Sequence, residues 1–415
     1  MFAHQNRCVR AILCYAVASM CNAQDWSEAE IIARFQSQSP QVREARARVA
    51  VAEADARTRT VLPNPSAYYS REGAGYTTFF QASQTLPTSG RLRYLRDAGA
   101  ASVSVAQADR DALLWSLQSD IRVTFYRAVA AQERARQITA AIADVEQLIR
   151  VLRQRETEGE GSRYDRLRAE RELTELRTDL VTAQSWAAAA RARLTGFLPE
   201  GSASVPQVSG QLLVLAQPPA LDALVRRAFS ARAEYRSEQQ SLTRYVAEEQ
   251  AALRLRIPEP TITGGVKRAN GTSGLAPNPF ADITKTALAF SISIPLPTFN
   301  RGQYDVARAQ AEQEQVRARV ASLAHRIRTE LQTASDVFTL ANESLAAYQR
   351  ELDNAGTELT RVTQVAYQEG EIGILELLDA LRVNRAANLR LLDLQAAAKE
   401  AFIELERAVG QEVRP

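Results

Sequence analysis

Carboxylates gather where glycines interrupt two long helix-forming tracts. The acids are Glu156, Glu158 and Glu160 in the first half of the chain, and Glu369 and Glu371 in the second; the glycines are Gly159, Gly161, Gly370 and Gly373. If copies of the chain surround one axis, symmetry repeats each carboxylate into a ring that favours cations. We therefore predict a gate of Glu369 and Glu371, held shut by pairing with Arg361 and Arg382 on neighbouring helices. A solvated acidic hairpin tip is the alternative.

Other residue patterns that do chemistry are missing from the sequence. It contains no G-x-S-x-G, H-E-x-x-H or P-loop motif. His325 is isolated in helix-forming sequence, and a zinc site needs several ligands. The net charge of +3 also does not suggest a nucleic-acid partner. The chain is therefore predicted to be no enzyme and to bind no cofactor, metal or nucleic acid.

The first 23 residues have the pattern of a secretory signal peptide. Arg7 and Arg10 precede an apolar run at 11–20, and a small-residue site at 21–23 follows. All three cysteines lie in this segment, so the mature chain would form no disulfide. A lipoprotein signal with Cys21 acylated and a buried helix are the alternatives.

Prolines divide the remainder into two similar halves. None occurs between Pro87 and Pro199, or between Pro297 and Pro415. We predict repeats at 24–198 and 221–415, joined by a linker at 199–220. The halves share short motifs in the same order: 51–53 with 246–248, 63–65 with 258–260, 86–91 with 296–301, and 158–161 with 369–372.

Each half contains a long tract with coiled-coil spacing. The stretch 91–157 would be about 100 Å long as one helix, at 1.5 Å per residue. Such a length suits a coiled coil or the wall of a tube. The apolar series, in steps of four and three, are Ile138, Ile142, Val145, Ile149 and Leu152, then Leu352, Ala355, Leu359, Val362 and Ala366.

Strand patterns lie between the proline clusters. Leu288, Phe290, Ile292 and Ile294 alternate with small or polar residues, which places them on one face of a strand. The span 66–86 fits two strands of the length that a membrane crossing needs. We predict that the four apolar residues face lipid, with the edge hairpin of a soluble sheet as the alternative. Beyond residue 24 no apolar run approaches the length of a membrane helix.

Four strands in one chain cannot close a barrel, and an open sheet edge is not tolerated in lipid. Two chains would supply 8 strands, whose interior side chains fill; three would supply 12, which leaves room for water. The expected fold is mainly α with a small β part: a duplicated long-helix coiled-coil barrel plus four transmembrane strands per chain.

The sequence resembles the TolC-type outer-membrane efflux proteins from Asp25 to about Gln411. The motifs that carry the resemblance are 39–40 with 62–65, the junctions 84–91 and 294–302, and most specifically the stretch 367–380, Tyr-Gln-Glu-Gly-Glu-Ile-Gly-Ile-Leu-Glu-Leu-Leu-Asp-Ala. The resemblance implies a homotrimer with a 12-stranded barrel in the outer-membrane lipid and a helical tunnel in the periplasm.

The resemblance also implies partners: a periplasmic adaptor and an inner-membrane pump of the RND or ABC type. The hairpin tips at Glu158, Gly159, Gly161, Gly370 and Gly373 would then be the adaptor-docking elements. The expected function is a passive conduit that exports small molecules or metal ions, and the sequence leaves the choice between them open. A soluble periplasmic coiled-coil scaffold or adaptor is the alternative function.

Overall fold

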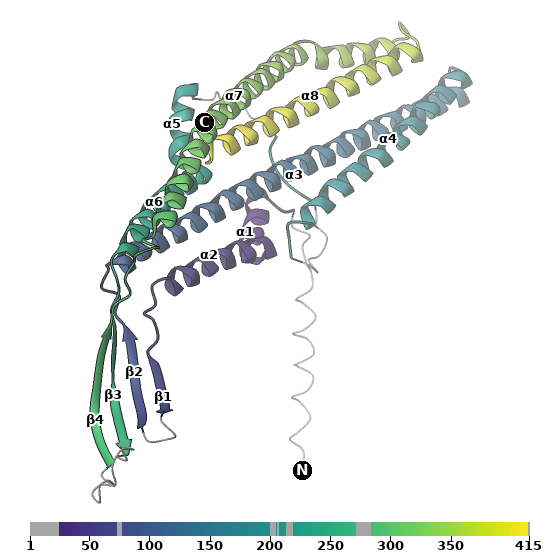
Figure 1. The fold of residues 1–415 in the computed structure, drawn as a ribbon. Helices are drawn as coiled ribbons and strands as arrows, with labels where there is room; N and C mark the ends of the chain where they lie inside the picture. Colours follow the sequence, from purple (N-terminus) through teal and green to yellow (C-terminus); the bar gives the residue numbers. More distant parts are fainter. Residues whose placement is uncertain are drawn as a thin grey trace, which may run out of the picture. The chain divides into compact units, whose positions relative to one another are not determined.

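Every helix and strand of the first half has a counterpart in the second (Figure 1). The computed structural model describes residues 25–72, 77–199, 205, 207–212, 219–270 and 284–413. The predicted signal peptide with Cys21, and much of the predicted linker, lie outside the described residues. The first half comprises α1 (Glu28–Gln38), α2 (Pro40–Thr58), β1 (Ser66–Glu72), β2 (Thr77–Thr85), α3 (Arg91–Thr157) and α4 (Arg163–Thr195). The second comprises α5 (Leu221–Ala231), α6 (Ala233–Leu253), the 3-10 turn η1 (Arg254–Arg256), β3 (Thr261–Asn270), β4 (Thr284–Ser293), α7 (Gln303–Gln368) and α8 (Ile374–Val409).

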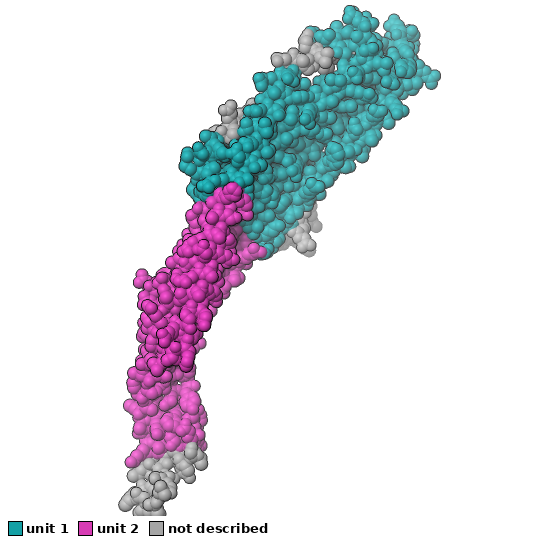
Figure 2. All heavy atoms as spheres, turned by 45° about the horizontal axis from the view of Figure 1, so that its top comes forward, with its two compact units in different colours: residues 1–44, 113–231, 327–415 teal, residues 45–112, 232–326 magenta. Residues whose placement is uncertain are grey.

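The chain divides into two compact units, and each unit takes segments from both halves (Figure 2). Unit 1 contains residues 1–44, 113–231 and 327–415, and unit 2 contains 45–112 and 232–326. Neither sequence repeat therefore forms a compact body of its own. The predicted repeat boundaries at 24–198 and 221–415 stay a prediction. No helix in the described part of the chain is both long and apolar enough to cross a membrane.

Unit 2 contains a four-stranded antiparallel sheet in the order β1-β2-β3-β4. Directly paired residues point to the same face, so the strand register shows on which face of the sheet each side chain lies. One face carries, from β4 to β1, the rows Ile292–Ile262–Gln84, Phe290–Gly264–Ala82–Ala67, Leu288–Val266–Phe80–Tyr69 and Thr286–Arg268–Thr78–Arg71. The opposite face carries mainly Ser, Thr, Ala, Gln and Lys. The predicted alternation therefore extends over the whole sheet.

The same turn leads from sheet to long helix in both halves. The Thr88 N–H donates to the Leu86 carbonyl, and the Thr298 N–H donates to the Leu296 carbonyl, each over 2.8 Å. The proline between the two residues presets its own φ for such a turn. The repeated Leu-Pro-Thr motif thus has one local structure at both positions.

A glycine with positive φ ends each junction. Gly90 (φ 75°) directly precedes α3, and Gly302 (φ 79°) directly precedes α7. The second junction is longer, so Arg91 begins a helix whereas Arg301 precedes the glycine. The two arginines align in the sequence motif but do not occupy equivalent positions in the structure. At Gly302 a Cβ would come within 2.7 Å of the Ala252 carbonyl oxygen, which leaves no room for another residue.

Unit 1 is built from long antiparallel helices with a continuous apolar seam. The predicted series in α3 is confirmed: Ile138, Val145, Ile149 and Leu152 are buried, and Ile142 packs against them. In the part of α7 that belongs to unit 1, Ile327 is buried, and Leu331, Phe338 and Leu345 are buried at seven-residue intervals. Of the series predicted farther along α7, the side chains of 355 and 359 lie outside the described residues, and Val362 is exposed in the single chain.

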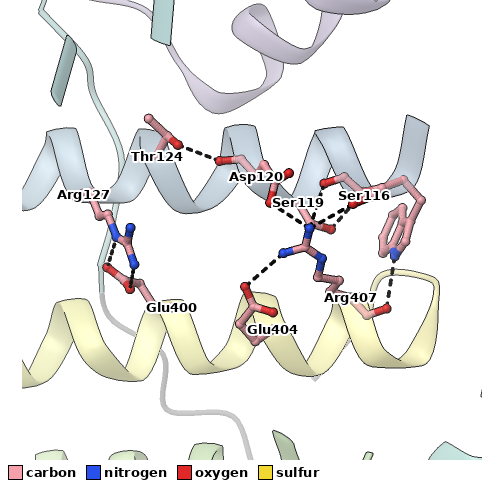
Figure 3. Close-up of polar contacts among 9 residues, drawn as sticks. Ser116, Ser119, Asp120, Thr124, Arg127, Glu400, Glu404 and Arg407 are labelled. Carbon is pink, nitrogen blue, oxygen red and sulfur yellow. Dashed lines mark hydrogen bonds and ion pairs between the residues drawn. The ribbon is translucent and has the colours of Figure 1, made fainter. Parts of the chain in front are cut away.

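Ion pairs join α3 to α8 at the same seven-residue interval. Arg407 Nη2 lies 2.7 Å from Asp120 Oδ1, and Arg127 holds both oxygens of Glu400 (Figure 3). Arg134 pairs with Asp393 one heptad farther on. The positions ascend along α3 as they descend along α8, which is the register of an antiparallel coiled coil.

The first short helix is anchored to this framework. Ser27 caps α1 and exchanges hydrogen bonds with Glu30 in a capping box. This arrangement holds the pKa of Glu30 below its usual range, mainly through the Ser27 N–H. From α1, Glu28 reaches α3, where its carboxylate accepts hydrogen bonds from Arg122 and Tyr126, each 2.5 Å long.

Candidate functional site

The two helical hairpins of unit 1 reverse through the same backbone motif. At the end of α3, the Glu160 N–H donates to Arg155 O, and the Gly159 N–H donates to Glu156 O. At the end of α7, residues 371 and 370 donate in the same way to residues 366 and 367. Both ends are Schellman motifs, with glycine in the left-handed conformation at φ 79° and 76°. The predicted reversals are thus both present and alike.

The second glycine of each tip has a different role. At Gly161 a Cβ would lie 2.8 Å from the Glu156 nitrogen, so the tight turn excludes any side chain. Gly373 is the N-cap of α8 and has no side-chain cap. In the first hairpin the N-cap is Ser162, whose hydroxyl accepts from the Tyr164 N–H. The hairpins therefore share their C-terminal caps and differ where the next helix starts.

The predicted tip acids differ in their surroundings. Glu156 accepts a 2.6 Å hydrogen bond from Arg166, and Glu158 accepts one of 3.0 Å from Gln154. Glu369 and Glu371 are exposed, as is Arg361. The structure therefore holds Glu156 and Glu158 within their own hairpin and leaves Glu369 and Glu371 facing solvent.

Arg382 ties the two hairpins together through Glu172. Its Nε lies 2.7 Å from Glu172 Oε2, and Arg385 Nη1 lies 3.3 Å from the other oxygen. Glu172 belongs to α4 and is 3% exposed, whereas both arginines belong to α8. The hydrogen bond that Arg382 donates to the Glu172 carboxylate raises the pKa of Arg382. The structure thus gives Arg382 a partner other than Glu369 or Glu371, and pairing between subunits stays a prediction.

Apolar side chains of α3, α4 and α8 fill the space between the hairpins. They are Ile138, Val145, Ile149 and Leu152, Ala169, Leu176 and Ala183, and Ile374, Leu377 and Leu378. Arg155 of α3 lies over the Tyr367 ring of α7, 5.7 Å from its centre. Burial raises the pKa of Tyr367, and the Asp165 carboxylate adds to the effect.

Two cavities adjoin this apolar layer. One of about 300 Å³ lies among α3, α4 and α8, beside Asp144, Glu172 and Arg385. Another of about 290 Å³ lies among α3, α7 and α8, beside Tyr367. Packing between the hairpins is therefore incomplete close to their tips.

Sequence reasoning missed Glu172 and Tyr367 as links between hairpins. Glu172 stands among many charged residues of α4, and nothing in the local sequence marks it as the buried one. Tyr367 lies inside the most specific motif, which was a usable signal. Among the described residues, no three His, Cys, Asp or Glu side chains converge as a metal site would require.

Glu172→Gln is expected to weaken the contact between the hairpins. It removes the buried negative charge and replaces one of the two acceptor oxygens by an NH2 donor, so that one arginine loses its acceptor. We expect a cost of about 2 kcal/mol for local opening of α8. Hydrogen–deuterium exchange of the α8 amides around Arg382 measures that opening. Glu175→Gln is the matched control, because Glu175 is 54% exposed and lies 3.3 Å from the same arginine. Equal exchange in both variants would contradict the assigned role of Glu172.

The second candidate surface is the apolar face of the sheet in unit 2. Leu288, Phe290 and Ile292 are 89%, 69% and 56% exposed, and Ile294 lies one residue beyond the end of β4. Tyr69 and Phe80 pack with ring centres 4.8 Å apart on the same face. An apolar sheet face this exposed requires a covering surface.

Comparison with known proteins points to one class. Residues 255–411 match the family model for outer membrane efflux proteins. The cobalt-zinc-cadmium resistance protein CzcC of Cupriavidus metallidurans is 21% identical over 358 residues, which cover 85% of this chain and 82% of CzcC. The pyoverdine export outer membrane protein OpmQ of Pseudomonas putida is 26% identical over 357 residues, which cover 82% of this chain and 71% of OpmQ.

Solved channel structures share the fold. The CusC structure aligns with a TM-score of 0.69 at 21% identity and covers 94% of this chain and 93% of CusC. The open state of the Neisseria gonorrhoeae MtrE channel aligns with a TM-score of 0.70 at 20% identity, and the alignment covers 92% of this chain and 89% of MtrE.

The duplicated hairpins, the two-faced sheet and these matches define an outer-membrane efflux channel subunit. Residues 255–411 carry the sequence pattern of outer membrane efflux proteins, and the relatives and solved structures that the chain resembles are of the same class. The predicted family, fold class and channel function are confirmed, and they favour a channel over a soluble periplasmic scaffold.

Proposed function

We propose that three copies of this chain form a passive conduit from the periplasm to the exterior. The observation that carries the proposal is the two-faced sheet. One face is apolar and exposed, and the other presents small polar side chains such as Ser83, Thr263 and Ser291. Each chain contributes four strands, so three chains supply the 12 that a water-filled barrel needs. Leu288, Phe290, Ile292 and Ile294 face lipid in this arrangement.

Fractionation tests the assembly. The full chain is expected in the outer membrane as a trimer that requires detergent and changes its gel mobility on heating. A soluble monomer would contradict the proposal, because a lone four-stranded sheet leaves its apolar face and both edges uncovered.

The helical hairpins form the periplasmic end of the conduit. The tips at Glu158, Gly159, Gly161, Gly370 and Gly373 dock a periplasmic adaptor, which in turn connects to an inner-membrane pump of the RND or ABC type. Support comes from the capped, glycine-built shape of both tips. The exposed Glu369 and Glu371 form the gate at this end, and Arg361 and Arg382 pair with them across neighbouring helices when the gate is shut.

The double variant Glu369→Gln with Glu371→Gln is expected to reduce cation selectivity. It is also expected to change the single-channel conductance about twofold or more. The reason is that three copies of the pair place six carboxylates around the axis. Planar-bilayer recording of the purified trimer measures both quantities. Glu314→Gln is the control, because Glu314 lies on the same helix and is 75% exposed but is remote in sequence from the tip. Unchanged conductance and selectivity in the double variant would refute the gate.

The cargo is a small solute selected by the pump. CzcC is named for resistance to cobalt, zinc and cadmium, and OpmQ for pyoverdine export. A conduit lined by small polar side chains accommodates either kind of cargo. Export assays with each candidate pump, in cells lacking this chain and in complemented cells, decide the cargo.

A further inference from the structure

The apolar face of the sheet ends in a row of cationic and hydroxyl side chains. Pairing places Arg71, Thr78, Arg268 and Thr286 in one line across all four strands. Both arginines are exposed. No Asp or Glu stands at the paired positions of this face. Glu72 follows Arg71 in the chain but points to the opposite face. The row is therefore a positively charged border on an otherwise apolar surface.

The border lies where an arginine is tolerated next to lipid. Helices adjoin the other end of the sheet, near Thr85 and Thr261, so the row lies toward the hairpin ends of the strands. From Ile292 to Thr286 is about 20 Å along the strand at 3.4 Å per residue. A cationic side chain costs several kcal/mol at the bilayer midplane but little at its edge.

The row directly beneath supports this placement. Tyr69 and Phe80 form an aromatic pair there, beside Val266 and Leu288. Aromatic residues gather where the hydrocarbon region of a membrane barrel meets the headgroups. Toward the hairpin ends, the row that holds the aromatic pair is thus followed directly by the arginine row.

We infer that Arg71 and Arg268 bind the phosphate groups of lipid A in the outer leaflet of the outer membrane. A guanidinium matches the oxygens of phosphate through two parallel hydrogen bonds. Thr78 stands between the two arginines in the row and adds a hydroxyl donor. In a trimer the row supplies six arginines around the barrel. The inference depends on the proposed membrane orientation of the sheet.

Lipid selectivity of the purified full-length trimer tests the inference. Native mass spectrometry in detergent compares binding of bisphosphorylated lipid A with that of its dephosphorylated form. The wild type is expected to prefer the phosphorylated lipid at least tenfold, a difference of about 1.4 kcal/mol. Arg71→Gln with Arg268→Gln is expected to remove the preference, whereas Arg71→Lys with Arg268→Lys retains most of it because the charges remain.

Lys267→Gln is the matched control. Lys267 precedes Arg268 but points to the polar face, where its ammonium lies over the Phe79 ring. The control is expected to keep the preference. A preference that survives the double glutamine variant, or that Lys267→Gln also removes, would overturn the inference.

Channel recording separates this inference from the proposed function. The double glutamine variant is expected to conduct like the wild type. If the wild type conducts but shows no preference for phosphorylated lipid, only the lipid site is refuted. If the wild type forms no channel, the proposed function itself is wrong.

Discussion

Arg122→Gln is expected to lower the free energy of unfolding by about 3 kcal/mol. Arg122 is 11% exposed and lies between two carboxylates, Glu28 of α1 and Glu406 of α8. Its Nη1 is 2.6 Å from Glu406, which is 3% exposed and also accepts the Val413 N–H over 2.8 Å. Removing the guanidinium leaves a buried carboxylate without its cation.

The loss is expected to depend on pH. Burial raises the pKa of Glu406, and the charge of Arg122 opposes that rise. Without Arg122 the folded-state pKa moves farther above its value in the unfolded chain. The folded state then binds more protons than the unfolded state, so stability falls as pH rises through this window. The variant should therefore be destabilised more at pH 8 than at pH 5.

Thermal unfolding of the detergent-solubilised protein, followed by helical circular dichroism, measures both effects. Arg127→Gln is the control from the same pair of helices (Figure 3). Arg127 is 55% exposed, so its pair with Glu400 is screened by solvent and is expected to contribute less than about 1 kcal/mol. Equal losses for Arg122 and Arg127, or a loss at Arg122 that grows toward pH 5, would refute the assignment.

Gly265→Ala is expected to reduce the yield of folded trimer at least tenfold. A Cβ at this position would lie 2.1 Å from the Phe80 carbonyl oxygen and 2.7 Å from the Gln81 Cα. Both atoms belong to the backbone of β2, which pairs with β3 here, so neither can move without breaking the ladder. An overpacked site typically costs 1–3 kcal/mol, and trimer symmetry repeats that cost three times.

The neighbouring glycine supplies a close control. Gly264 lies on the apolar face, and a Cβ there would meet nothing within 4 Å. Gly264→Ala is therefore expected to assemble like the wild type. Gel analysis of heated and unheated membrane samples compares the two variants. Normal assembly of Gly265→Ala would show that β2 and β3 are not packed this closely in the trimer.

Regular patterns were readable from the sequence because they reflect backbone periodicity. Leu288, Phe290 and Ile292 alternate as a two-faced strand requires, and Ile138 to Leu152 follow a heptad. Gly159 and Gly370 indicated the hairpin reversals, because this helix cap needs a positive φ, which glycine adopts with little strain. Repetition of these signals in two halves identified the duplicated architecture without any contact information.

Pairings between distant residues needed the tertiary structure. Whether Arg382 faces Glu172 or a tip acid depends on the rotation of α8 against α4, and many charged residues on these helices have similar local sequences. The same holds for Arg122, which the sequence does not distinguish from Arg127, although one is buried and the other is not.

The division between sequence and structure follows from the range of the forces involved. The sequence by itself determined the helices, strands, turns and duplication of this efflux protein, because those depend on residues a few positions apart. Only the tertiary structure decided that Gly265 rather than Gly264 touches the next strand and that Arg71 aligns with Arg268. Both results depend on strand register, which brings together segments nearly two hundred residues apart in the chain.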